Sequence, residues 1–317
     1  MSRRTYPSRF AHGLMFHRFH KSDSAPAGQG SVTEAEFESV LNYVGPERIL
    51  TPEEWISRVK RCSLQKDHLC ITFDDGLRSQ FDVALPVLEK YKLKAFWFVF
   101  SSVFNGEIDR NEVYNRFTVT GFSSFDEFVA EFLKFYPVDG KAFEGNDYKL
   151  FSKGLEKLFP FYTENDLKYR YIRNKLFTRS DFERVMDSLI ESKGLSVSKM
   201  AEDLWLTNAH LQSLHRNGHC IGLHSYDHPF EIAYLNVEEQ RNQYLRNYKH
   251  ISHITGDIVE CMSHPLNSYS QDTIDILSKL GIVCGFRSNI TPPVGKAINA
   301  HSLALAREDG GNLLQSL

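Results

Sequence analysis

The 317-residue sequence lacks several features that would each have indicated a class of protein. No segment approaches the ~20 consecutive apolar residues of a membrane span, and the first sixteen residues lack the apolar stretch of about 7–15 residues found in a secretory signal. The five cysteines include no C-x-x-C pair, so they predict neither a disulfide framework nor a cysteine-rich zinc module. We therefore expect a cytoplasmic protein without a membrane span, whose thiols stay reduced.

Clusters of basic residues are missing as well. Lys and Arg number 37 against 40 Asp and Glu, which gives a net charge of −3 and a pI near 6.5. Because the basic residues are scattered, the sequence does not predict a nucleic-acid partner. It also contains no internal repeat and no low-complexity segment. The chain is long enough to bury a substantial core, and its oligomeric state is not predicted.

Apolar runs typical of strands alternate with segments of helical period. Predicted strands lie at 13–19, 68–75, 94–102, 219–225, 258–265 and 282–288, and predicted helices at 33–45, 51–61, 83–93, 207–218, 237–256 and 270–281. Thr33 and Thr51 are candidate N-caps, and Gly218 is a candidate C-cap. The alternation favours an α/β fold with a parallel sheet or a (β/α) barrel.

The alternation stops between residues 105 and 204. This stretch is polar and aromatic, has mainly helical period and contains no convincing strand. We expect one barrel domain over residues 10–317 with a helical insertion at 105–204. The insertion either caps the active site or packs at the side of the barrel as a dimer contact, and aromatic residues at helical spacing suit both.

Ionisable residues follow two of the predicted strands. Asp74 and Asp75 end one strand, and His224 and His228 follow another in the sequence HSYDHP. Taken alone, the aspartates could form a D-G turn and the histidines could lie in a surface turn. Ligands, however, gather at the carboxyl ends of parallel strands, and two histidines with one carboxylate are a standard three-ligand metal set. A cation would compensate one buried aspartate and leave the other free to act as a general base.

Several stretches resemble motifs of the polysaccharide deacetylase family. TFDDG (72–76) is similar to its first motif and HSYDHP (224–229) to its second. LMFHRF (14–19) is similar to its opening strand, the stretch 263–286 to its third motif, and AREDGGNLL (306–314) to a late segment. The resemblance covers residues 10–104 and 205–314. It implies a distorted (β/α) barrel that binds a divalent metal, usually zinc, and removes acetyl groups from amino sugars.

The resemblance also implies roles for single residues. Asp74 would be the general base, while Asp75, His224 and His228 would bind the metal. The backbone N–H of Leu266, by its position in the third motif, would stabilise the oxyanion.

The third motif departs from the family pattern. Ser263 and its two successors stand where the family often supplies an arginine that positions the base. Arg307 is our preferred replacement, and Arg18 is the alternative.

The catalytic acid is also open, because the family commonly uses a late histidine. His301 is the only late histidine after the third motif. His17, at the end of the first strand, is favoured on expected geometry, and His264 is a further choice. A structural, hydrogen-bonded role is the alternative for each of these histidines.

Two functions fit these observations. The first is a metal-dependent hydrolase that removes an acetyl or other small acyl group from an amino sugar or sugar derivative, such as an intracellular precursor of a surface glycan. The second is a non-catalytic, sugar-binding relative that keeps the fold and the metal site. Because the three ligands and the base are all present, we favour the enzyme.

Overall fold

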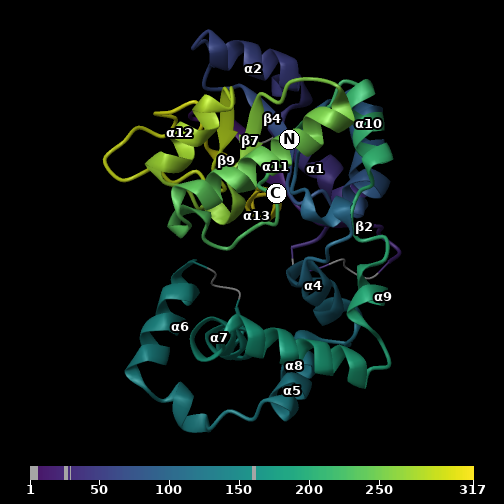
Figure 1. Cartoon of the computed structure of the whole chain (residues 1–317), viewed down its shortest axis with the longest axis vertical. Coiled ribbons are helices and arrows are strands. Elements are labelled where there is room, and N and C mark those ends of the chain that lie inside the picture. The colour runs from purple at the N-terminus through teal and green to yellow at the C-terminus, as the bar shows by residue number, and fades with distance from the viewer. Residues whose placement is uncertain (1–5, 25–27, 29, 159–161) are drawn as a thin grey trace. The chain divides into compact units, whose positions relative to one another are not determined.

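The computed structural model describes residues 6–24, 28, 30–158 and 162–317. They form two compact units (Figure 1). The first unit holds residues 6–24, 30–108 and 203–317, and the second holds residue 28 and residues 109–202. The insertion predicted at 105–204 includes residues 159–161, and the N-terminal stretch considered above includes residues 1–5; both of these short segments lie outside the described residues.

The first unit is built on a sheet of seven parallel strands in the order β8-β7-β6-β5-β4-β1-β9. The strands are β1 (His12–Phe16), β4 (Leu69–Phe73), β5 (Ala95–Val99), β6 (Cys220–Leu223), β7 (Cys261–Ser263), β8 (Cys284–Phe286) and β9 (Arg307–Asp309). Residues 302–305 lie between the two edge strands, since Gly285 N–H donates to the Ser302 carbonyl and Arg287 N–H to the Leu305 carbonyl. The sheet is therefore nearly closed, and the predicted distorted (β/α) barrel is confirmed.

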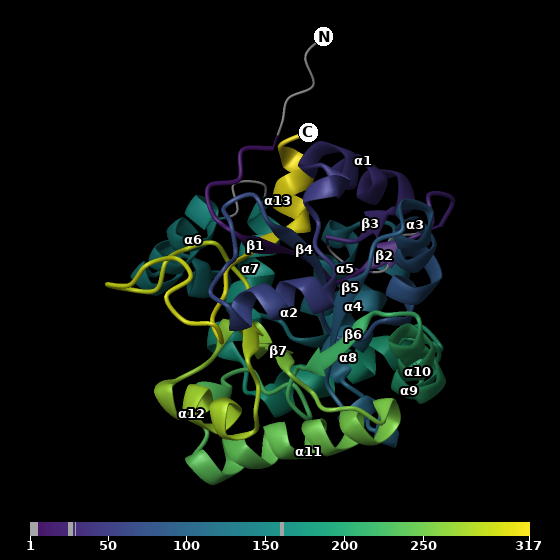
Figure 2. The ribbon, with the colours of Figure 1, turned by 90° about the horizontal axis from the view of Figure 1, so that it is seen from above.

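Aromatic side chains fill the inside of the barrel. Phe96 and Phe98 of β5 lie 5.4 and 5.6 Å from the ring of Phe286 of β8, although β6 and β7 separate these strands in the sheet. Trp55 of α2 (Pro52–Lys60) stacks on Phe286, and Figure 2 shows α2 lying across the barrel. Trp97 lies between Phe96 and Phe98 on β5. Because successive side chains of a strand point to opposite faces, Trp97 belongs to the other buried cluster of the first unit.

Helices pack on the outside of this sheet. They are α1 (Glu34–Val44), α3 (Leu85–Tyr91), α10 (Asn208–Arg216), α11 (Val237–Thr255), α12 (Gln271–Lys279) and α13 (Gly310–Gln315). Thr33 and Thr51 are N-caps, as predicted, and each forms a reciprocal capping box with a glutamate three residues later. Among the described residues, no helix combines the length and the apolar character needed to cross a membrane.

The predicted elements differ from the structure at several places. The strand predicted at 13–19 breaks at His17, and the chain then forms a separate parallel pair, β2 (Phe19–His20) with β3 (Val32–Thr33). Strand β9 was not predicted, because three polar residues carry no strand pattern. Gly218 is not the C-cap of α10; Asn217 is, and Gly218 follows it with a left-handed φ of 82°.

The helix predicted at 83–93 begins earlier, with a π-helical turn at Gln80–Ala84. Pro86 lies in the first turn of α3 and has no N–H to donate to the residue four positions earlier. Leu85 N–H bonds to the Gln80 carbonyl, five positions back. Proline therefore accounts for the wider turn.

The second unit contains helices only, within its described residues. They are α4 (Arg110–Thr120), α5 (Phe125–Phe135), α6 (Asn146–Leu158), α7 (Glu164–Tyr171), α8 (Arg179–Ser192) and α9 (Val197–Ala201). Phe132 and Tyr169 meet edge to face at 5.3 Å between α5 and α7, and Phe177 and Phe182 contact Phe132 as well. Aromatic residues of this segment thus form the unit's own core.

His219, buried at the start of β6, makes the barrel sensitive to acid. The Ala95 N–H and the Trp97 indole N–H donate to its Nδ1 at 3.1 and 3.2 Å, so this nitrogen must be unprotonated. Burial lowers the pKa of His219 to about 4 from the usual 6.5. Between these two pH values the unfolded chain therefore binds a proton that the folded protein does not. The contribution of neutral His219 to the free energy of unfolding is lost as the pH falls through that window.

We expect the free energy of unfolding to drop between pH 7 and pH 4 by about 1–3 kcal/mol more in the parent than in His219→Gln. Urea unfolding at both pH values measures the difference. An identical pH dependence in the two proteins would contradict this assignment.

Candidate metal centre

Three strands deliver buried polar residues to one edge of the barrel. Asp74 and Asp75 directly follow β4, His224 follows β6, and Ser263 ends β7. Asp75 has a left-handed φ of 72°, and Gly76 follows with φ 62°. A Cβ atom on Gly76 would lie 2.9 Å from a Val99 methyl group, so the turn that places Asp75 requires glycine next to it.

Asp75, His224 and His228 meet in one group, in which Asp75 and His224 are buried and His228 is partly exposed. Asp75 Oδ1 lies 3.4 Å from His224 Nε2 and 3.5 Å from His228 Nε2. One ligand atom from each residue lies within 4.8 Å of the others. Asp75 Oδ1 is buried without a hydrogen-bond partner among the described residues. An unpartnered carboxylate oxygen facing two ring nitrogens is a set of donors that fits a divalent cation such as zinc.

Hydrogen bonding prepares His224 for this role. Its Nδ1 lies 2.9 Å from the Ser263 carbonyl, and this carbonyl can only accept. The ring proton therefore belongs on Nδ1, which leaves the lone pair of Nε2 directed at Asp75.

The pKa shifts in this group reflect burial and close charges. Burial lowers the pKa of His228 to about 4, so this ring is neutral near pH 7. Burial also acts to lower the pKa of His224, but the charges of Asp74 and Asp75 outweigh it and raise that pKa. For Asp75, burial acts to raise the pKa, and the neighbouring histidines more than offset it. The carboxylate is therefore ionised.

Asp74 pairs with an arginine, whereas Asp75 faces the two histidines. Arg307 donates two parallel hydrogen bonds to its carboxylate, Nη1 to Oδ1 and Nη2 to Oδ2, each 2.7 Å long. Both residues are buried, and this fork is the strongest pairing available to a carboxylate. Burial acts to raise the pKa of Asp74, but the charge and hydrogen bonds of Arg307, together with the charges of His224 and His17, outweigh it and lower the pKa.

Arg307 reaches Asp74 through the inside of the barrel. A Cβ atom on Gly13, its partner residue on β1, would lie 3.0 Å from the Arg307 side chain. Glycine at this position leaves room for the arginine. Nη1 also donates to Thr72 Oγ1 at 3.2 Å, and Nε donates to the Arg287 carbonyl at 2.7 Å.

Ser263 is a site residue that the sequence pattern did not reveal. Its hydroxyl accepts from Arg307 Nη2 at 2.7 Å and donates to Asp74 Oδ2 at 3.2 Å, while its carbonyl holds His224. Ser263 thus links Asp74, Arg307 and His224. No sequence signal marks it, because a single serine at a strand end is common.

Removing Arg307 should destabilise the protein. Arg307→Met would leave the Asp74 carboxylate buried and unpaired, which costs about 3–5 kcal/mol. Urea unfolding measures this loss. The double variant Arg307→Met/Asp74→Asn removes the charge as well and should recover most of it. A single variant as stable as the parent would refute the pairing.

The three histidines considered as the catalytic acid lie in different surroundings. His17 Nε2 lies 3.9 Å from Asp74 Oδ2, and its side chain is 30% exposed. His264 is buried, and its Nε2 lies 2.7 Å from the Leu303 carbonyl. His301 is exposed, and its Nδ1 accepts from Leu303 N–H at 3.0 Å. Of the three, His17 is the one that the structure places beside Asp74.

Leu266 and Arg18 lie on loops of the first unit. Leu266 has a left-handed φ of 48° in the turn Pro265–Asn267, and its side chain is half exposed. Arg18 lies between β1 and β2, and its carbonyl accepts from Val32 N–H. Arg307, not Arg18, forms the ion pair with Asp74 that the structure shows.

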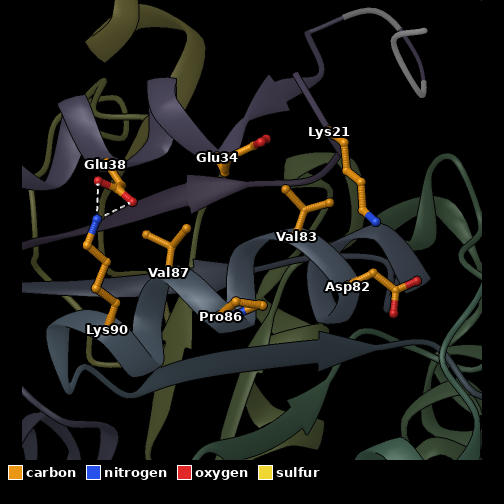
Figure 3. Close-up of a pocket in the computed structure, with 8 residues that line it drawn as sticks. All are labelled: Lys21, Glu34, Glu38, Asp82, Val83, Pro86, Val87 and Lys90. Carbon is orange, nitrogen blue, oxygen red and sulfur yellow. Dashed lines mark hydrogen bonds and ion pairs between the residues drawn. The ribbon is translucent and has the colours of Figure 1, made fainter. Parts of the chain in front are cut away.

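A separate cavity of about 320 Å³ lies between α1 and α3 (Figure 3). Lys90 and Glu38 form an ion pair at its edge. Its lining is Lys21, Glu34, Glu38, Asp82, Val83, Pro86, Val87 and Lys90, which includes none of the predicted site residues. Buried ionisable groups gather at the strand ends, so the candidate site is placed there.

Comparisons with known proteins agree with this architecture. A family model described as polysaccharide deacetylase matches residues 62–123 and 185–285, just over half of the chain. The deacetylase PplD from Streptococcus pyogenes, solved with acetate, has a TM-score of 0.55 and 15% identity over 96% of both chains. IcaB from Ammonifex degensii has a TM-score of 0.54 and 15% identity over 94% of this chain and 91% of its own.

The deacetylase domain of BpsB from Bordetella bronchiseptica has a TM-score of 0.52 and 12% identity over 96% of both chains. At these identities the structural likeness establishes the fold. No curated protein matches the sequence.

Proposed function

Because this chain belongs to the polysaccharide deacetylase family, we propose that it is a metal-dependent hydrolase that removes an acetyl or other small acyl group from an amino sugar or sugar derivative. One observation carries the proposal. Asp75, His224 and His228 form a largely buried three-ligand set beside a second aspartate, Asp74, that Arg307 holds separately. In such a pair, one carboxylate can bind the metal while the other accepts a proton.

Asp75, His224 and His228 would hold the metal, most simply Zn²⁺, for which two imidazoles and a carboxylate are familiar ligands. When bound, the ion would act as a Lewis acid toward the acyl carbonyl and toward water.

Asp74 is the proposed general base. Its carboxylate would accept a proton from the water that attacks the acyl carbon. Arg307 would hold the plane of the carboxylate through its two hydrogen bonds and keep it ionised. The hydrogen bond from Ser263 to Oδ2 would orient the same oxygen.

His17 is the proposed acid for the departing group. It lies beside Asp74 and is partly open to solvent, whereas His264 is committed to a backbone carbonyl. The N–H of Leu266 is the proposed donor to the oxygen that gains negative charge.

We propose an intracellular precursor of a surface glycan as the substrate. The family match supports an acetylated carbohydrate, and the relative from S. pyogenes was solved with acetate. The experiment is to measure acetate and formate released by the zinc-loaded protein from N- and O-acylated amino sugars. Release that saturates with substrate supports the enzyme; binding of sugars without release by the zinc-loaded protein would favour the non-catalytic alternative.

We expect the inserted helical segment to restrict the substrate to small or terminal sugars. The chain leaves the first unit after Ile108 and returns at Asp203. Near these points, Ser102 N–H donates to the Tyr226 carbonyl and Leu206 N–H donates to the Gly76 carbonyl. Both bonds are made next to motifs that carry proposed metal ligands. The measurement compares turnover of monosaccharide-sized and polymeric acetylated substrates. Faster cleavage within a long polymer would contradict the restriction and favour the segment as a dimer contact.

A further inference from the structure

The loop that carries two of the proposed metal ligands, residues 224–228, has an unfavourable backbone. Ser225 and His228 both have left-handed φ values, 66° and 55°. Non-glycine residues adopt this region at a cost of order 1–3 kcal/mol each, so surrounding contacts must hold them there. One contact is local, since the Ser225 hydroxyl accepts from His228 N–H at 3.2 Å.

Asn247 of α11 holds the start of this loop. Its Oδ1 accepts from the His224 N–H at 2.9 Å, and its Nδ2 donates to the Val99 carbonyl at 2.9 Å. Val99 and Leu223 are the last paired residues of β5 and β6. A direct bond between His224 N–H and the Val99 carbonyl would extend that ladder, and the fully buried amide of Asn247 bridges the two groups instead.

Further hydrogen bonds fix the Asn247 amide in place. Its Nδ2 also donates to Ser101 Oγ at 2.6 Å, and that hydroxyl bonds to His250 Nδ1 at 2.8 Å. His250 Nε2 bonds in turn to Asn208 Oδ1 of α10 at 2.9 Å. The partners of the amide therefore come from β5, the loop after β5 and the loop after β6.

Gln243 holds the middle of the loop. It lies one helical turn before Asn247 on the same face of α11. Its Oε1 accepts from the N–H groups of Tyr226 and Asp227 at 3.0 and 3.1 Å. The backbone N–H groups of four of the five loop residues, all except Ser225, thus bond to a side-chain acceptor.

We propose that Asn247 and Gln243 are positioning residues that preorganise the 224–228 loop for metal binding. The inference rests on the proposed metal site. Among the described residues, neither amide hydrogen-bonds to a side chain of the three ligands; both bond to the backbone of the 224–228 loop. Without them the loop would have to be ordered when the ion binds, and that ordering would reduce the affinity.

The test measures the dissociation constant for Zn²⁺ of the full chain by competition with a chromogenic chelator. Gln243→Leu and Asn247→Leu should each weaken zinc binding by about 10–100-fold, the usual cost of losing an outer partner of a metal ligand. Gln243→Glu should retain the parent affinity, because a carboxylate accepts both N–H groups. Amide exchange at Tyr226 and Asp227 in the metal-free protein should become faster in Gln243→Leu and stay slow in Gln243→Glu.

Gln240 is the matched control. It lies on the same helix and is fully buried, but it bonds the Leu235 carbonyl and Thr273 Oγ1 and makes no bond to the loop. Gln240→Leu should lower the thermal unfolding temperature and leave zinc affinity unchanged. Because Gln243 is only half-buried, its variants remain informative if Asn247→Leu does not fold.

The outcomes separate this inference from the proposed activity. Parent-like zinc affinity in Gln243→Leu, or an equal loss in Gln240→Leu, would overturn the positioning role even if acetate is released. Loss of affinity as expected, in a protein that releases no acetate, would support the positioning role and reject the activity. A parent protein that binds no zinc would overturn both.

Discussion

Replacing Asp74 by asparagine should leave zinc bound and reduce kcat by about 10²-fold or more, the usual contribution of a positioned general base. The amide is nearly isosteric with the carboxylate but cannot accept a proton from water near neutral pH. Its oxygen can still accept from Arg307, which is 2.7 Å from the carboxylate in the parent. The loss of kcat should therefore come from proton transfer. Because the buried Arg307 loses its counter-charge, the variant should also be less stable, and its zinc content reports whether it remains folded.

Asp75→Asn is the control for the Asp74 variant, because it changes the adjacent residue in the same way. Here zinc affinity itself should fall, since an amide is a poorer ligand than the ionised carboxylate. Measuring zinc content and acetate release for both variants separates the two roles. Activity of Asp74→Asn within a few-fold of the parent would remove Asp74 from the mechanism.

The second large effect concerns the two histidines. The double variant His224→Ala/His228→Ala should bind no stoichiometric zinc and should release acetate only at the background rate. Two of the three proposed ligands disappear, and a lone carboxylate does not hold zinc tightly. Equilibrium dialysis followed by metal analysis gives the stoichiometry, and the acetate assay gives the rate.

Substitution of an exposed histidine is the control for the double variant. His253→Ala, on the exposed face of α11, should keep one zinc ion and parent activity. Stoichiometric zinc in the double variant would show that the ion binds elsewhere and would contradict the proposed metal site.

Much of the barrel follows from local pattern. Strands β4 and β5 are fully buried, so their sequences LCITF and AFWFV read as continuous apolar runs between turn residues. The helix starts at Thr33 and Thr51 were predictable because a capping box needs only a threonine and a glutamate three residues later. Strand β9 was not, because its three residues owe their conformation to pairing with β1.

In the candidate site too, some residues can be predicted from the local sequence and others cannot. Residues of the first two motifs could be selected because chemistry-bearing side chains stood together in the sequence at strand ends. Arg307 could be selected as a candidate from its place in the late segment, but nothing local indicates that its side chain runs past Gly13 to reach Asp74. Ser263, Asn247 and Gln243 bond to residues of the 224–228 loop that lie 16 to 39 positions away in the chain, and such pairings appear only once the chain is folded.

Zinc titration of the chelator-treated protein tests the central claim most directly. Acetate release from an acetylated amino sugar is measured as zinc is added in fractions of an equivalent. The account predicts no release before addition, a linear rise, and a plateau at one equivalent per chain. Full activity in the metal-free protein, or zinc binding that leaves the rate at background with every acylated sugar tested, would contradict it.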